Sequence, residues 1–94
     1  MNYVLGSAVE IFCEIPLDKV SGTTLTLDEL LDPDGVDLSS SETLTFSTET
    51  GKTNIASVVW QSSKTANIKG KYTYTVKAVN GSKDNFETGS FYLK

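Results

Sequence analysis

Apolar and polar residues alternate over short segments along most of this chain. The first clear segment covers residues 8–16, where every second side chain is apolar: Val9, Ile11, Cys13 and Ile15. A period of two is typical of a β-strand with one buried and one exposed face. We expect the residues between them to lie on the exposed face, namely Glu10, Phe12 and Glu14. Pro16 should end the strand, because proline cannot donate a backbone hydrogen bond within a sheet.

Similar patterns predict four further strands, over residues 3–5, 23–30, 43–49 and 55–61. The side chains expected to point inward in the second and third of these are Leu25, Leu27, Leu44 and Phe46. In the fourth, two registers remain open: the core-facing set is either Ala56, Val58 and Trp60 or Ile55, Ser57 and Val59. At Leu30-Leu31 a short helix is the alternative to a strand, and the neighbouring residues favour the strand.

The end of the chain predicts a long hairpin. Residues 70–79 and 89–93 are rich in aromatic and β-branched side chains, and the dipeptide Asn80-Gly81 between them favours a tight turn. A second turn is predicted at Asp32-Pro33-Asp34-Gly35, because proline fixes φ and glycine accepts the chain reversal. About seven short strands separated by turns indicate an all-β sandwich or barrel.

Length and composition indicate a single domain over residues 1–94. A hydrophobic content of 38% is enough for one modest core. No run approaches the ~18 apolar residues of a membrane-spanning helix, so we expect no membrane partner. The segment after Met1 has neither the basic nor the apolar region of a secretion signal, and we therefore expect the protein to fold in a cytoplasm.

The composition also excludes several classes of chemistry. Histidine is absent, which removes Ser-His-Asp triads, Cys-His pairs and histidine-ligated zinc. All eight basic residues are lysines, so the bidentate arginine contacts typical of nucleic-acid readers are missing, and the net charge is −4. We expect no enzyme activity, no cofactor and no nucleic-acid partner.

Cys13 is the only cysteine, so no disulfide forms within the chain. Its place among alternating apolar residues predicts a buried thiol that acts as a small hydrophobic side chain. A reactive thiol needs a neighbouring cation to lower its pKa, whereas Glu10 and Glu14 should raise the pKa of Cys13.

The two halves of the chain differ in charge. Residues 1–49 hold ten acidic residues and one lysine, for a net charge of −9, and residues 50–94 hold seven lysines and two acidic residues, for +5. One interpretation is that strands from the two halves lie side by side and neutralise each other. The alternative is a body with an acidic and a basic face, which could form a salt-sensitive homo-oligomer. The candidate interaction surface consists of Lys69, Lys71, Lys77 and Lys83.

Three other groups of residues have both a functional and a structural interpretation. Asp32, Asp34 and Asp37 could hold calcium, but they lack the spacing of an EF-hand, and turn formation is favoured. Asn80-Gly81-Ser82 matches a glycosylation motif and also a plain hairpin turn, which we favour. The aromatic residues Trp60, Tyr72 and Tyr74 should belong to the core, not to a ligand platform. The Tyr72 hydroxyl could also bond back to a loop carbonyl, as a sandwich corner tyrosine does.

Several short motifs occur in a characteristic order: Val9-Glu10-Ile11, Thr24-Leu25-Thr26-Leu27, Asp32-Pro33-Asp34-Gly35, the segment Gly70 to Ala78, Asn80-Gly81 and Gly89-Ser90-Phe91. Together they resemble the bacterial and bacteriophage immunoglobulin-like domains. The resemblance implies a Greek-key β-sandwich that serves as a binding or spacer module in virion parts or in bacterial surface proteins. It carries over no functional residue.

The resemblance leads to one expectation and one alternative. We expect a non-enzymatic phage protein of the tail, baseplate or head that docks on another virion protein, found in the virion or in the host cytoplasm. Surface modules usually occur in tandem behind a signal peptide, and this chain shows neither. The alternative is a bacterial cell-surface module for adhesion or carbohydrate binding. Docking would use an exposed edge strand or the charged faces.

Overall fold

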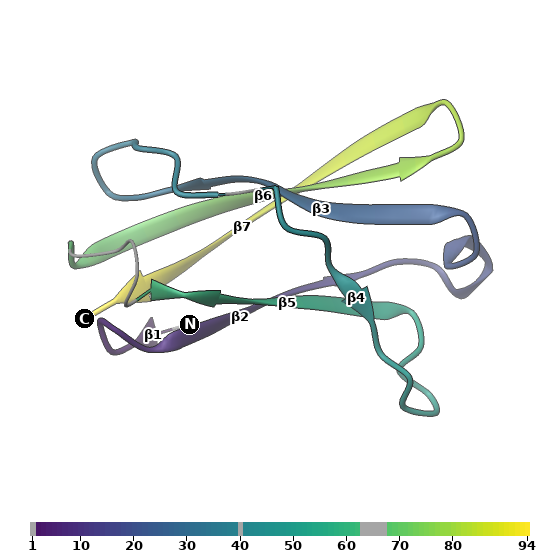
Figure 1. Ribbon diagram of the computed structural model, residues 1–94, viewed down its shortest axis with the longest axis horizontal. Coiled ribbons are helices and arrows are strands. Elements are labelled where there is room, and N and C mark those ends of the chain that lie inside the picture. The colour runs from purple at the N-terminus through teal and green to yellow at the C-terminus, as the bar shows by residue number, and fades with distance from the viewer. Residues whose placement is uncertain (1, 40, 63–67) are drawn as a thin grey trace.

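The fold is a sandwich of two β-sheets, as predicted (Figure 1). The computed structural model describes residues 2–39, 41–62 and 68–94. One sheet has the strand order β1-β7-β6-β3 and the other has the order β2-β5-β4. The strands are β1 (Asn2–Tyr3), β2 (Ala8–Glu14), β3 (Thr23–Leu31), β4 (Thr45–Phe46), β5 (Ile55–Gln61), β6 (Gly70–Asn80) and β7 (Lys83–Leu93). A short 3-10 turn, η1 (Leu17–Lys19), connects β2 with β3.

Alternation along β2 and β5 builds the inner face of the three-stranded sheet. In β2 every second residue from Val9 to Cys13 is buried, whereas Phe12 on the other face is half exposed. In β5, Ala56 and Trp60 are buried, which decides between the two registers that the sequence left open. The two strands pair antiparallel along their whole length, so their apolar positions line the same side of the sheet.

A β-bulge in β3 brings a third leucine into the core. Leu27 pairs with Val76 of β6, but the next pair joins Glu29 with Thr75, so Asp28 is the extra residue. An extra residue shifts the alternation by one position. As a result Leu30 faces the core together with Leu27, and both are fully buried. The strand continues to Leu31, as predicted, and no helix forms at this point.

The closing hairpin carries the aromatic part of the core. Its two strands pair from Gly70–Leu93 to Asn80–Lys83, on either side of the predicted turn. Tyr72 and Phe91 are direct neighbours in this register, and their rings stack with centroids 5.4 Å apart. Trp60 comes from the other sheet, and its ring centroid lies 5.9 Å from that of Tyr72 and 6.1 Å from that of Phe91. The aromatic residues are therefore core, as expected.

Two contacts hold the start of β6 in place. The Tyr72 hydroxyl donates a 2.6 Å hydrogen bond to the backbone carbonyl of Ile68, four residues upstream, which is the corner bond expected from the sequence. The predicted turn at residues 32–35 forms as well, with a bond of 2.9 Å from the Gly35 amide to the Asp32 carbonyl. Gly70 packs so closely on this turn that an added Cβ would lie 2.8 Å from Cγ of Pro33.

The bounds of several predicted strands differ from those in the structure, and β7 begins at Lys83 and not at residue 89. The strand predicted over residues 43–49 is reduced to β4, because the chain first crosses from one sheet to the other: the Leu44 amide bonds to the Leu25 carbonyl of β3 at 2.9 Å. The strand predicted over residues 8–16 ends at Glu14, because residues 17–19 turn into η1. The first strand covers only residues 2–3 and pairs parallel with the end of β7.

The packing of Gly89 against Tyr74 gives a test of the core. These residues are direct partners in the β6–β7 ladder, and a Cβ at position 89 would lie 2.8 Å from Cε2 of the Tyr74 ring and closer still to its hydroxyl oxygen. We expect Gly89→Ala to lower the free energy of unfolding by about 1–3 kcal/mol, because the ring must move out of a packed core. Urea denaturation measures this loss. Ser90→Ala, on the opposite face of β7, is the control, and an equal effect of both changes would contradict the packing argument.

Candidate functional site

The groups with shifted pKa values serve the fold. The Cys13 thiol is buried and donates a 3.2 Å hydrogen bond to Oε2 of Glu87. Burial and, after it, the Glu87 carboxylate raise the pKa of Cys13 to about 12, so the thiol is not activated as a nucleophile. The expectation that Glu10 and Glu14 raise this pKa is wrong, because both lie on the opposite face of β2. Burial likewise raises the pKa of Tyr72 and Tyr74.

Two of the three aspartates considered for calcium, Asp32 and Asp37, hold backbone amides. Oδ1 of Asp32 accepts bonds from the amides of Asp34 and Val36 at 2.9 and 2.8 Å. Oδ1 of Asp37 accepts bonds from the amides of Ser39 and Leu30, and these bonds lower the pKa of Asp37. Within the described ranges, no three His, Cys, Asp or Glu side chains come together in a way that could hold a metal ion. The favoured interpretation, turn formation, accounts for these oxygens.

The four lysines of the candidate interaction surface do not share one face. Lys71 and Lys77 lie on the outer face of β6, and the Lys77 ammonium is 3.8 Å from Oδ2 of Asp84. Lys83 lies on the inner side of the hairpin tip, where it lines a cleft together with Ala78. Lys69 is exposed just before β6 begins. Only Lys71 and Lys77 are thus brought onto a common surface.

The acidic and the basic half of the chain are interleaved in both sheets. β3 from the acidic half pairs with β6 from the basic half, and β2 pairs with β5 in the same way. This arrangement favours mutual neutralisation over a body with one acidic and one basic face. Local groups of charged side chains are therefore more informative than the charge of each half.

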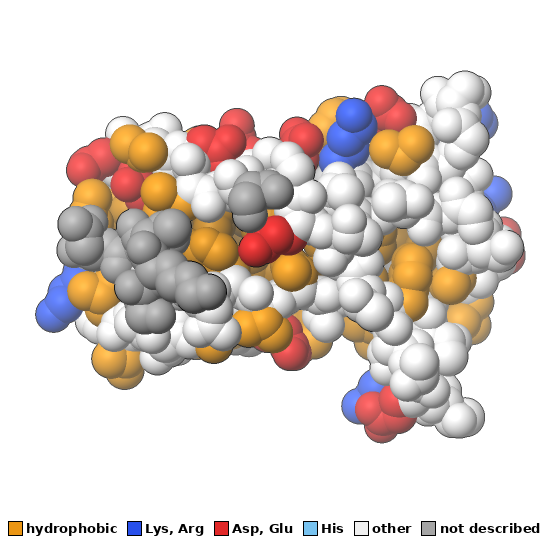
Figure 2. All heavy atoms as spheres, viewed as in Figure 1, with side chains coloured by type: hydrophobic (Ala, Val, Ile, Leu, Met, Phe, Trp, Pro, Cys, Tyr) orange, Lys and Arg blue, Asp and Glu red, His pale blue; other side chains and the backbone are white. Residues whose placement is uncertain are grey.

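One such group forms a groove on the outer face of the three-stranded sheet, which we call the acidic groove. Its volume is about 590 Å³, and it is lined by Glu10, Phe12, Glu14, Ser47, Glu49, Lys52, Ile55 and Ser57. Phe12 is 50% exposed at its floor. The turn between β4 and β5 forms one wall and projects from the body, with charged side chains of both signs at its tip (Figures 1 and 2).

The charge of the acidic groove is negative. Its one lysine, Lys52, is 3.5 Å from Oε1 of Glu49, so these two charges offset each other. Glu10 and Glu14 have no cation within 4.0 Å among the residues that the structure describes. The exposed Val59 extends the apolar surface, because it is the direct partner of Glu10 in the β2–β5 ladder. The groove therefore combines an exposed aromatic ring with two unpaired carboxylates.

The free edge of β7 is less suited to binding. β1 pairs only with Tyr92 and Leu93, and the rest of this edge has no strand neighbour in the described part of the chain. Such an edge can in principle accept an added strand. However, Glu87 points inward to Cys13, and an inward-pointing charge on an edge strand is a known means of preventing strand addition. A face is thus a better candidate than this edge.

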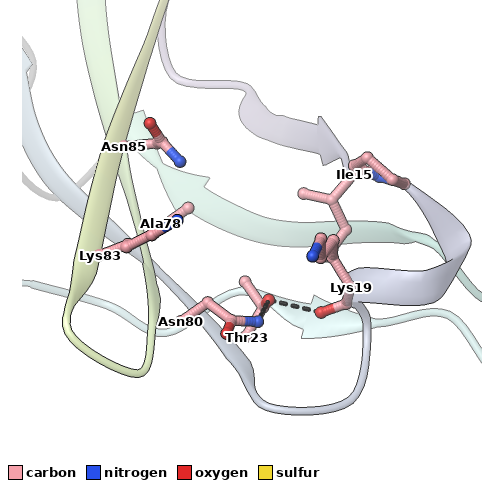
Figure 3. A pocket seen from close by; sticks show the side chains of 8 residues that line it. Ile15, Lys19, Thr23, Ala78, Asn80, Lys83 and Asn85 are labelled. Carbon is pink, nitrogen blue, oxygen red and sulfur yellow. Dashed lines mark hydrogen bonds between the residues drawn. The ribbon is translucent and has the colours of Figure 1, made fainter.

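A second hollow, which we call the basic cleft, opens between the β6–β7 hairpin and the connection from β2 to β3 (Figure 3). Its volume is about 380 Å³, and its lining consists of Ile15, Pro16, Lys19, Thr23, Ala78, Asn80, Lys83 and Asn85. This cleft was not predicted, because its two walls come from segments about sixty residues apart. That Lys19 and Lys83 line one cleft becomes evident only from the three-dimensional arrangement of the strands.

No helix in the described residues is long and apolar enough to cross a membrane. Comparison of the chain with family models, curated proteins and solved structures gives no match.

The Cys13–Glu87 contact predicts a specific dependence of stability on alkaline pH. The folded pKa of Cys13, about 12, lies above the ordinary value of 9.0, so its contribution to stability is complete below pH 9.0 and is lost as the pH rises toward 12. The free energy of unfolding of the native protein should therefore fall more steeply over this range than that of Cys13→Ala. Tyr72 and Tyr74 titrate in both proteins, and Cys13 itself helps to raise the pKa of Tyr74, so the difference between the two urea-denaturation series reports the thiol together with its effect on Tyr74. Parallel curves would show that the thiol has no such role.

Proposed function

We propose that this protein is a non-enzymatic docking module and that the acidic groove is its docking surface. The observation that carries the proposal is the half-exposed Phe12 between Glu10 and Glu14. The partner would be a protein that places an apolar side chain on Phe12 and lysine or arginine side chains against the two carboxylates. The resemblance to virion-associated immunoglobulin-like modules leads us to expect another virion protein as this partner.

The energetic argument starts from Phe12. When a partner covers a half-exposed aromatic ring, apolar surface is removed from water, and this contributes favourably to the free energy of binding. Aromatic anchors of this kind supply much of the binding energy at protein interfaces. Glu10 and Glu14 flank this ring on the same strand and remain hydrated in the free protein. They favour encounter with basic partners and disfavour acidic ones, nucleic acid included.

The architecture supports the likeness to immunoglobulin domains. Two sheets with the orders β1-β7-β6-β3 and β2-β5-β4 agree with a Greek-key sandwich in which the last strands lie beside the first. The bond from the Tyr72 hydroxyl to the Ile68 carbonyl resembles the tyrosine corner of such domains. The structural or accessory role in a virion is proposed from the resemblance alone.

The docking proposal predicts a strong effect at Phe12. Proteins encoded by neighbouring genes are titrated against the purified protein by calorimetry. We expect one of them to bind, and we expect Phe12→Ser to weaken that binding by about tenfold or more, because the ring is the central apolar anchor. Replacing Glu10 and Glu14 together by glutamine should also weaken binding, and the loss of affinity should be larger at low salt than at high salt.

The matched control is Tyr92→Ser. Tyr92 is 41% exposed, but it lies on the outer face of the other sheet. This change should leave binding unaffected, and urea denaturation of each variant verifies that the fold is retained. If Tyr92→Ser weakens binding as much as Phe12→Ser does, or if no neighbouring gene product binds, the acidic groove is not the docking surface.

A further inference from the structure

The basic cleft has a frame that holds its two walls together. Nδ2 of Asn80, at the hairpin tip, donates a 2.7 Å hydrogen bond to Oγ1 of Thr23, at the start of β3. The Thr23 hydroxyl donates in turn to the backbone carbonyl of Lys19 in η1. This chain of hydrogen bonds connects the hairpin tip with the start of β3, and through it with η1 four residues earlier (Figure 3). The cleft is thus pre-formed, which lowers the conformational cost of binding.

The charged groups of the cleft are two lysines on opposite walls. Figure 3 shows the Lys19 side chain reaching into the opening from η1, across from the hairpin that carries Lys83 and Asn85. Neither ammonium has a carboxylate within 4.0 Å in the described ranges, and no acidic side chain belongs to the lining. The nearby Asp84 lies on the other face of β7 and pairs with Lys77. The cleft therefore has a local positive charge in a protein whose net charge is −4.

The remaining lining provides neutral polar and apolar contacts. The Asn85 amide points into the opening and can both donate and accept a hydrogen bond. The carbonyl oxygen of Asn80 is a further acceptor, because its bond to Thr23 uses the amide nitrogen. Ile15 and Ala78, which pack against the core, form an apolar floor. A volume of about 380 Å³ lies within the usual range of small-ligand sites.

We propose that the basic cleft binds a small ligand in which an oxyanion, a carboxylate or a phosphate, stands next to hydroxyl groups, as in an acidic sugar or a sugar phosphate. Lys19 and Lys83 hold the oxyanion from two sides. The Asn80 and Asn85 amides bond to the hydroxyl groups, and the carbon skeleton rests on Ile15 and Ala78. This site is separate from the acidic groove, and its test does not depend on the docking proposal.

Amide NMR spectra of the isotope-labelled protein test this inference. Glucuronate, inorganic phosphate and neutral glucose are titrated separately, which distinguishes a carboxylate from a phosphate and either anion from a sugar without charge. We expect at least one of the two anions to cause saturable shifts at the amides of Lys19, Thr23, Asn80, Lys83 and Asn85, with millimolar affinity. Glucose should cause none.

Variants identify the groups that bind the anion. Lys19→Gln and Lys83→Gln should each weaken binding about twofold to fivefold, the effect of one exposed ion contact. Lys71→Gln, on the outer face of β6, should leave the affinity unchanged. The spectra themselves verify that each variant is folded. The inference is overturned if neither anion saturates these shifts, if glucose matches the anions, or if Lys71→Gln weakens binding as much as the two cleft variants do.

Discussion

The packing of Trp60 against the Tyr72–Phe91 pair is the interaction on which the rest of this structure depends. Tyr72 and Phe91 can stack only in the register that the β6–β7 hairpin sets, and Trp60 then joins that hairpin to the other sheet. Without a disulfide, burial of apolar side chains holds the two sheets together, and these three rings are the largest members of the buried cluster. Gly89 belongs to the same arrangement, because it leaves the space that the Tyr74 ring occupies.

This dependence explains where function can lie. The inner faces of both sheets are taken up by the core, and the groups with shifted pKa values there, such as Cys13 and Tyr72, owe their shifts to burial and to contacts that stabilise the fold. The two binding surfaces proposed above therefore lie where the core leaves side chains free. These are the outer face around Phe12 and the end of the sandwich, where the hairpin extends past the core and leaves the basic cleft open.

Local features could be predicted from the sequence and non-local ones could not. Alternation gave the strands and, except in β5, their inner faces, and turn chemistry gave the hairpin at Asn80-Gly81 and the turn at residues 32–35. The bulge at Asp28 was missed, although the spacing of Leu25, Leu27 and Leu30 contains the signal for it. The contact of Cys13 with Glu87 could not be found, because it joins residues 74 positions apart in different sheets.

The distribution of charged side chains over the surface can be interpreted only once the strand register is known. Along the chain, the lysines of the second half suggest a single basic face. In the structure, strand alternation places Lys77 on the outer face, where Asp84 offsets its charge, and Lys83 on the inner side of the hairpin tip. There Lys83 lines the basic cleft together with Lys19, which is the one lysine of the acidic half. Two lysines from regions of opposite net charge thus create the local positive potential, whereas their sequence neighbours Asp18 and Asp84 lie outside the lining of the cleft.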